Sequence, residues 1–124
     1  MHRSRLAGFI IDCKTDDLGA AARFWSAALG MAAGDEEDGY DQLDASARDL
    51  DIQVQRVDHD SRVHLDIESD DIDAEAARLE RLGANRVGLV KRWWVMEAPT
   101  GQRFCIIRAK KSLDGAAGVT VWPD

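Results

Sequence analysis

The sequence predicts an α+β fold in which two βαβββ modules pair around a cleft. One reason is an internal repeat at an offset of 54 residues: DCKTDDLGAAA at 12–22 matches DIESDDIDAEA at 66–76, with five identical positions. Another is that both copies show the same order of elements: a strand, a capped helix, a glycine and further strands. The length of 124 residues allows one domain, and a chain of this size buries enough surface to fold without disulfides or metal.

Each copy opens with a strand, a helix and a glycine. The apolar runs at 8–11 and 63–67 suit strands. The side-chain oxygens at 15–17 and 69–71 can cap the N–H groups of a following helix, and the aspartates place negative charge at its positive end. Apolar residues then recur at helical spacing. The predicted helices and the glycines that end them are 18–29 with Gly30, and 72–82 with Gly83.

Shorter strands complete each copy. The second copy predicts strands at 86–91, 93–98 and 104–108, and the first copy predicts strands at 31–33, 40–45 and 50–57. The modules therefore extend over about 8–57 and 63–108, with an acidic connection at 34–39 in the first. In the tail, 109–124, the apolar run 119–122 is predicted to add an edge strand or to cover a partner subunit.

Charge and composition exclude several classes of function. The formal net charge is −7, which argues against a nucleic-acid binder and against attraction to an anionic membrane. The longest apolar stretches are far shorter than the roughly 20 residues that span a bilayer, and no signal-peptide pattern is present. The cysteines, Cys13 and Cys105, are far apart in the sequence, so we expect a reduced cytoplasmic protein.

These motifs resemble the vicinal oxygen chelate superfamily, which includes glyoxalase I, extradiol dioxygenases, and the bleomycin and fosfomycin resistance proteins. The resemblance covers about residues 8–108 and is strongest to the glyoxalase-like branch. It implies the paired-module fold and a homodimer. The segments that carry it are DDLGAAARFWSAALGM, VHLDIESDDIDAEAARLERLGA and APTGQRFCII.

The resemblance also implies where metal ligands would stand. In metal-using members, the first and last strands of each module supply them. The corresponding positions here are Ile10, His64 and Cys105, together with Gln53 or Gln55. Isoleucine has no donor atom, so we expect no complete metal site and no cofactor; a soft-metal site with His64 and Cys105 is the alternative.

Other candidate site residues follow from strand alternation. Asp66 shares a strand face with His64, and Asp12 shares one with Ile10, so two carboxylates and an imidazole meet if that face lines the cleft. The other interpretation is that both aspartates tie down strand ends. Trp93 and Trp94 alternate faces, and Trp94 is our candidate for an aromatic wall, with a place in the core as its alternative.

The expected function is the binding of a small apolar or aromatic molecule in the cleft. The residues expected to contact the ligand are Asp12, Gln53, Gln55, Trp94 and Cys105. The first alternative is a lyase or isomerase in which His64 transfers protons with Asp66 or Asp12. The second is a metal-dependent glyoxalase or dioxygenase with an altered ligand set.

Overall fold

Residues 1–123, which the computed structural model describes, form an α+β fold with eight strands in one hydrogen-bonded order. The strand order is β2-β3-β1-β4-β7-β6-β5, and β8 pairs with β1. The predicted fold class is confirmed. The elements are β1 (His2–Lys14), α1 (Leu18–Leu29), β2 (Tyr40–Leu43), a 3₁₀ turn (Ser46–Arg48), β3 (Asp51–Val57), β4 (Arg62–Ser69), α2 (Ile72–Arg81), β5 (Asn85–Val90), β6 (Trp93–Glu97), β7 (Arg103–Arg108) and β8 (Thr120–Trp122).

The chain divides into two compact units. Unit 1 comprises Met1–Ala7 and Leu65–Asp124, and unit 2 comprises Gly8–His64. The division falls inside β1 and inside β4, so each of these strands contributes to both units.

Both helices begin where the sequence predicts. The carboxylate of Asp17 accepts a hydrogen bond from the Ala20 amide at 3.1 Å, and that of Asp71 accepts one from the Ala74 amide at 3.0 Å. Helix α1 ends at Gly30, whose φ of 68° lies in the left-handed region that glycine adopts without strain. Neither α1 nor α2, the helices of the described residues, is long and apolar enough to cross a bilayer.

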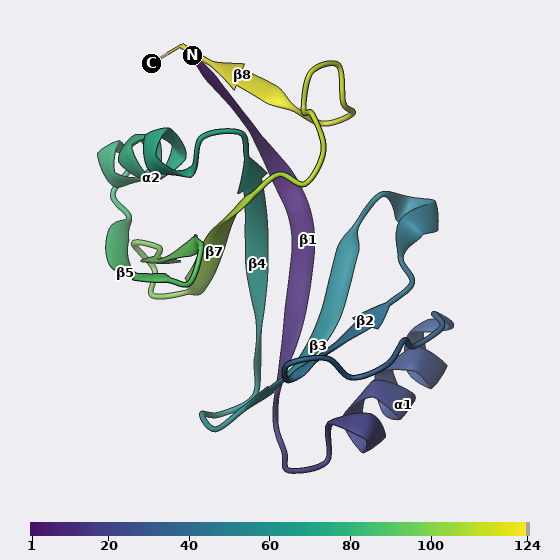
Figure 1. Ribbon diagram of the computed structural model, residues 1–124. Helices are drawn as coiled ribbons and strands as arrows, with labels where there is room; N and C mark the ends of the chain where they lie inside the picture. Colours follow the sequence, from purple (N-terminus) through teal and green to yellow (C-terminus); the bar gives the residue numbers. More distant parts are fainter. Residues whose placement is uncertain (124) are drawn as a thin grey trace. The chain divides into compact units, whose positions relative to one another are not determined.

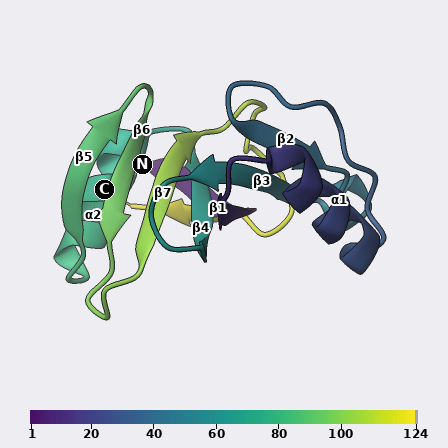
Figure 2. The same cartoon turned by 90° about the horizontal axis from the view of Figure 1, so that it is seen from below.

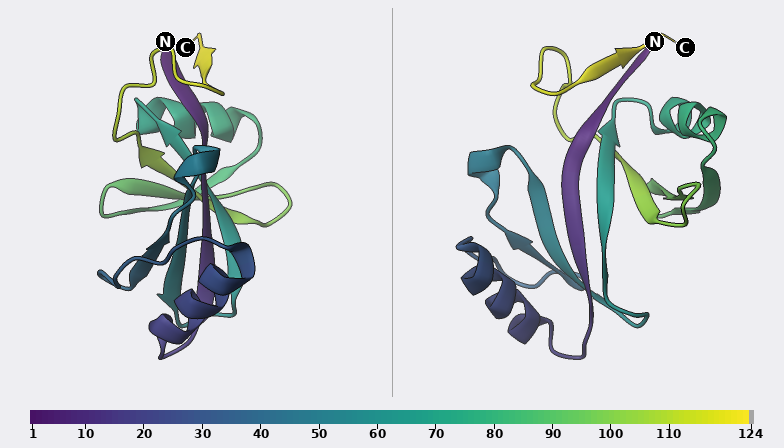
Figure 3. Two further views of the ribbon diagram at one scale, coloured as in Figure 1. Left: turned by 90° about the vertical axis from the view of Figure 1, so that its right-hand side faces the viewer. Right: turned by 180° about the vertical axis from the view of Figure 1, so that it is seen from behind.

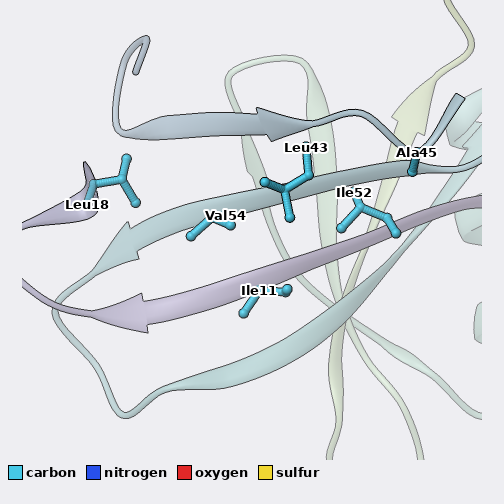
Figure 4. Close-up of a cluster of buried hydrophobic side chains, with 6 residues drawn as sticks. All are labelled: Ile11, Leu18, Leu43, Ala45, Ile52 and Val54. Atoms are coloured by element: carbon cyan, nitrogen blue, oxygen red, sulfur yellow. The ribbon is translucent and has the colours of Figure 1, made fainter. Parts of the chain in front are cut away.

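In unit 2, α1 covers one face of the strands. It lies beside β2 and β3 (Figure 1). Strand β3 pairs in parallel with β1 and antiparallel with β2. The covered face is apolar, and Figure 4 shows its buried side chains, which are Ile11, Leu18, Leu43, Ala45, Ile52 and Val54.

In unit 1, α2 covers one face of β5, β6 and β7, which lie side by side in Figure 2. Strands β6 and β7 are antiparallel, as are β5 and β6, whereas β4 and β7 are parallel. The core beneath α2 consists of Ile72, Ala76, Ala84, Met96 and Ile106. This unit therefore completes the predicted βαβββ order with β4, α2, β5, β6 and β7.

The structure differs from the sequence prediction at two places in the first copy. The strand predicted at 31–33 is reduced to an isolated bridge between Ala33 and Leu43. Strand β1 begins at His2 rather than at residue 8. Its early start has a partner in the tail: β8 pairs antiparallel with His2–Ser4 and runs beside the start of β1 in Figure 3. The tail therefore adds an edge strand, the first of the two predicted roles.

Candidate functional site

Asp12 and His64 form the central pair of the candidate site in unit 2. Oδ2 of Asp12, on β1, lies 2.7 Å from Nδ1 of His64, on β4. The Asp12 side chain is 2% exposed and the His64 side chain 13%. An ionised carboxylate can only accept, so the imidazole donates from Nδ1 to Asp12, and in the neutral imidazole Nε2 is then the nitrogen that accepts a proton.

The second carboxylate oxygen of Asp12 is buried as well. Among the described residues, Oδ1 of Asp12 has no hydrogen-bond donor. A nearby cation is Arg62, whose Nε lies 3.8 Å from Oδ2 and whose side chain is about half exposed. Buried acceptors are normally satisfied, so this oxygen has spare capacity for a donor such as a water molecule or a ligand group.

Amide side chains extend from Asp12 across the face of unit 2 opposite α1. Gln53 and Gln55 alternate with the core residues Ile52 and Val54, so they point away from α1. Gln55 stands in register with Asp12, and Gln53 with Ile10. We call this surface, with Asp12, Gln42, Gln53, Gln55 and His64, the polar face of unit 2.

One amide on the polar face is uncommitted. The carboxylate of Asp51 accepts from Gln42 at 2.6 Å and from Gln53 at 3.2 Å. The Gln55 side chain, by contrast, makes no hydrogen bond with any of residues 1–123. Gln55 is therefore the amide of this face that remains available to a ligand, and Tyr40, its register partner on β2, is a neighbour that the sequence analysis missed.

In unit 1, Asp66 and Cys105 are register partners on β4 and β7. Cys105 is also paired with Val95 on β6, and Trp93 shares the face of Val95 because it stands two residues away. All four side chains lie on the face opposite α2, which we call the Cys105 face. The sequence pointed to Trp93 only through its alternation with Trp94, which places the two side chains on opposite faces of the strand.

Trp94 lies on the other face of the same strand. Its register partner is the core residue Ile106, and its indole Nε1 donates a hydrogen bond to Asp73 at 2.8 Å. The guanidinium of Arg86 lies 4.7 Å from the centre of its ring. The structure therefore joins Trp94 to α2 and does not bring it to Cys105, whereas Trp93 reaches that face.

The strand registers also resolve which glutamine corresponds to Cys105. Asp12 and Asp66 are equivalent in the repeat; Asp12 pairs with Gln55 and Asp66 pairs with Cys105. Gln55 is thus the counterpart of Cys105, whereas Gln53 lies two residues earlier on β3 and pairs with Ile10. The sequence left this choice open because the last strands of the two modules are not separated by the 54 residues that separate the repeated segments.

The residues at the implied metal-ligand positions do not fit a complete site. Those positions hold Ile10, His64, Gln55 and Cys105, and Ile10 is an apolar side chain 3% exposed with no donor atom. Residues of metal-ligating types do occur along β4 and β7: His64 and Asp66 share a face of β4, and Cys105 pairs with Asp66. Imidazole, carboxylate and thiolate are each ligands that zinc accepts.

Comparison with known proteins identifies the family. The family model described as "Glyoxalase-like domain" matches residues 8–107. No curated protein matches the chain significantly.

Solved structures share the fold at low sequence identity. The Mn(II)-bound glyoxalase of Novosphingobium aromaticivorans is 19% identical with a TM-score of 0.61, over 89% of this chain and 43% of that one. Methylmalonyl-CoA epimerase of Mycobacterium tuberculosis is 18% identical with a TM-score of 0.62, over 90% and 92%. An extradiol ring-cleaving dioxygenase of B. fuscum is 16% identical with a TM-score of 0.59, over 86% and 33%.

These similarities establish the fold and leave the chemistry open, because one fold serves many reactions. The chain spans less than half the length of the Novosphingobium glyoxalase and about a third of the dioxygenase. The family model covers most of the sequence, and its description agrees with the motifs at 12–29 and 63–84. The chain therefore belongs to the glyoxalase-like domain family of the vicinal oxygen chelate superfamily.

Proposed function

We propose that the chain binds a small organic molecule at the polar face of unit 2 and that His64 transfers a proton to or from it. The observation that carries the proposal is the 2.7 Å contact between Nδ1 of His64 and the buried carboxylate of Asp12. A carboxylate that holds the Nδ1 proton orients the ring and leaves Nε2 as the base. Such a pair suits the removal of a proton from carbon, as in a lyase or an isomerase.

The other groups of the site would bind and orient the ligand. Gln55 offers a donor and an acceptor beside Asp12.

A second candidate is a protein that binds the same molecule without changing it. The presence of Ile10 at an implied ligand position favours this candidate, because an isoleucine cannot hold a metal that would act as a Lewis acid.

Isotope exchange distinguishes the two candidates. Candidate ligands, including methylmalonyl-CoA, dicarbonyl–thiol adducts and catechols, are first screened for an increase in melting temperature. A ligand that binds is then incubated with protein in D₂O, and incorporation of deuterium at carbon is followed by NMR. We expect exchange with the wild type, its loss in His64→Gln, and retained binding by that variant.

The outcome decides between proton transfer and binding alone. Binding without exchange would overturn the enzymatic proposal and support the binding protein. Asp12→Asn is the companion variant: it should reduce exchange and alter the ¹⁵N shifts of the His64 ring, because the partner that holds the Nδ1 proton is lost. Gln42→Ala, on the same face but bonded to Asp51, is the matched control.

Metal content tests the cofactor proposal, which is that no divalent metal takes part. Protein purified without chelator is analysed by mass spectrometry, and melting is measured with added zinc, nickel or manganese. Near-stoichiometric metal together with a higher melting temperature would overturn this proposal. In that case His64→Gln and Cys105→Ser should each abolish the increase.

The assembly and location are also proposals. We propose a cytoplasmic homodimer. The edge strand β5 supports pairing with a second copy, because it exposes Val87 and Leu89, which are 48% and 57% accessible. Analytical ultracentrifugation tests the dimer, and a monomer at all concentrations would contradict it.

A further inference from the structure

Unit 1 contains a cavity that is built entirely from its own residues. The cavity has a volume of about 370 Å³ and lies where β4 and β7 end and β1 begins. Ligand sites of small molecules start at about 300 Å³, so the cavity is large enough for one. None of its lining residues belongs to the Asp12–His64 pair or to the Cys105 face.

Hydrogen bonds fix the walls of this cavity. The Arg3 amide donates to Oδ1 of Asp70 at 2.7 Å, and the Ser69 hydroxyl donates to the Arg3 carbonyl at 2.8 Å. The Ala109 amide donates to the Ser69 carbonyl at 3.0 Å, which ties the segment after β7 to the end of β4. Leu113, which is 3% exposed, anchors the same segment further along. The site is therefore largely formed before any ligand binds, which lowers the cost of ordering it.

The charges in the cavity leave a positive surplus. Nη1 of Arg3 lies 3.3 Å from Oδ2 of Asp70, and Nη2 of Arg3 lies 4.0 Å from Oδ1 of the exposed Asp114. Arg108 and Lys111 also line the cavity, and neither has an acidic partner among residues 1–123. The lining residues therefore carry three cations and two carboxylates, a surplus of one positive charge in a chain with a net charge of −7.

We propose that this cavity binds the phosphate group of a small molecule. The guanidinium of Arg108 can offer two parallel donors to phosphate oxygens, and the Lys111 ammonium supplies a second positive charge. The Ser112 hydroxyl, which accepts from the Asp114 amide at 3.2 Å, keeps its own proton available for a third contact. The remaining volume, along Ala109 and Leu113, holds the uncharged part of the ligand.

Titration with inorganic phosphate tests the site directly. Amide ¹H–¹⁵N shifts are followed at constant ionic strength, with chloride as the balancing anion. We expect saturable shifts of the amides at 108–113 with a Kd of about 1 mM, since the cations are exposed to water. Arg108→Gln and Lys111→Gln should each raise the Kd about tenfold, the effect of losing one charge-assisted hydrogen bond.

Matched variants separate a built site from general charge attraction. Lys110→Gln removes the same charge from the adjacent residue, which does not line the cavity, and should change the Kd less than about twofold. Asp114→Asn should lower the Kd, because it removes a carboxylate that competes for the cations. Shifts that do not saturate, or equal effects of the Lys110 and Lys111 variants, would overturn the proposal. The His64→Gln variant should bind phosphate as the wild type does. The phosphate-site proposal and the proton-transfer proposal are therefore tested independently of one another.

Discussion

Nε2 of His2 lies 2.8 Å from Oε1 of Glu75, and both side chains are completely shielded from solvent. Glu75 also accepts from Nε and Nη2 of Arg78 at 2.7 and 2.8 Å. The Arg78 guanidinium in turn lies 3.7 Å from the ring centre of Trp122, whose Nε1 donates to the Ser4 hydroxyl at 2.8 Å. This buried polar network joins the start of β1, helix α2 and strand β8 within unit 1.

Glu75→Gln should destabilise the protein by about 3 kcal/mol, because it removes the charge that compensates the buried network. Urea unfolding measures the loss. Glu80→Gln, also on α2, is the control: it breaks an exposed pair with Arg86 of β5 and should cost less than about 1 kcal/mol. Equal losses from the two variants would contradict the importance of the buried network.

The network should also make stability depend on pH. Burial alone would raise the pKa of Glu75, but hydrogen bonds from Arg78, His2 and Ser4 and the charge of Arg78 outweigh it and hold the pKa below its usual 4.5. The folded state therefore gains stability from ionised Glu75 above pH 4.5 and loses it as the pH falls through the lowered value. Unfolding free energies measured across this acidic range should fall with pH in the wild type and fall less in Glu75→Gln. If the unfolding free energies of the wild type and Glu75→Gln fell equally with pH, a group other than Glu75 would be responsible for the pH dependence.

Gly8→Ala should disrupt the pairing of β1 with β3. A Cβ at this position would lie 1.9 Å from the carbonyl oxygen of Asp51, its register partner, so the strands could not approach as they do. We expect a loss of about 3 kcal/mol in thermal or urea unfolding. Gly88→Ala, on β5, is the control because its Cβ would meet no atom within 4 Å. A Gly8→Ala protein as stable as the Gly88→Ala protein would contradict the close approach.

Cys13 should react slowly with alkylating reagents. Burial and the negative charge of Asp12 raise the pKa of the Cys13 thiol above 9.0, and a hydrogen bond with Trp25 only partly offsets them. Since the thiolate is the reactive form, the rate at neutral pH should be below that of a free cysteine. In a Cys105→Ser background, iodoacetamide labelling followed by mass spectrometry reports Cys13 alone. Asp12→Asn should accelerate labelling; no acceleration would exclude the charge of Asp12 as a contributor.

Trp122→Leu should loosen β8 from β1. The substitution removes the hydrogen bond to Ser4 and the stacking on Arg78, and we expect a cost of about 2 kcal/mol. Hydrogen exchange at 2–4 and 120–122 should become faster than in the wild type. Val121→Ala, at a half-exposed position on the same strand, is the control and should leave that exchange nearly unchanged.

The local order of elements was predictable from the sequence because it depends on neighbouring residues. Asp17 and Asp71 cap α1 and α2 as their position before an apolar helix predicts, and Gly30 ends α1. The repeat at 12–22 and 66–76 predicted that the two halves are built alike. Strand alternation in the sequence likewise places Asp66 on the same side of its strand as His64.

Tertiary structure decided which strand face is covered and which residues pair across strands. Alternation shows that Trp93 and Trp94 point to opposite sides, but only the pairing of Trp94 with Ile106 beneath α2 shows which one packs against the core. Similarly, the register of β1 with β3 selects Gln55 over Gln53 as the partner of Asp12. The polar start of β1 at His2 was not predicted, because its burial depends on Glu75 and Trp122, more than 70 residues away in the sequence. Periodicity is a property of adjacent residues, whereas burial and register depend on contacts between distant ones.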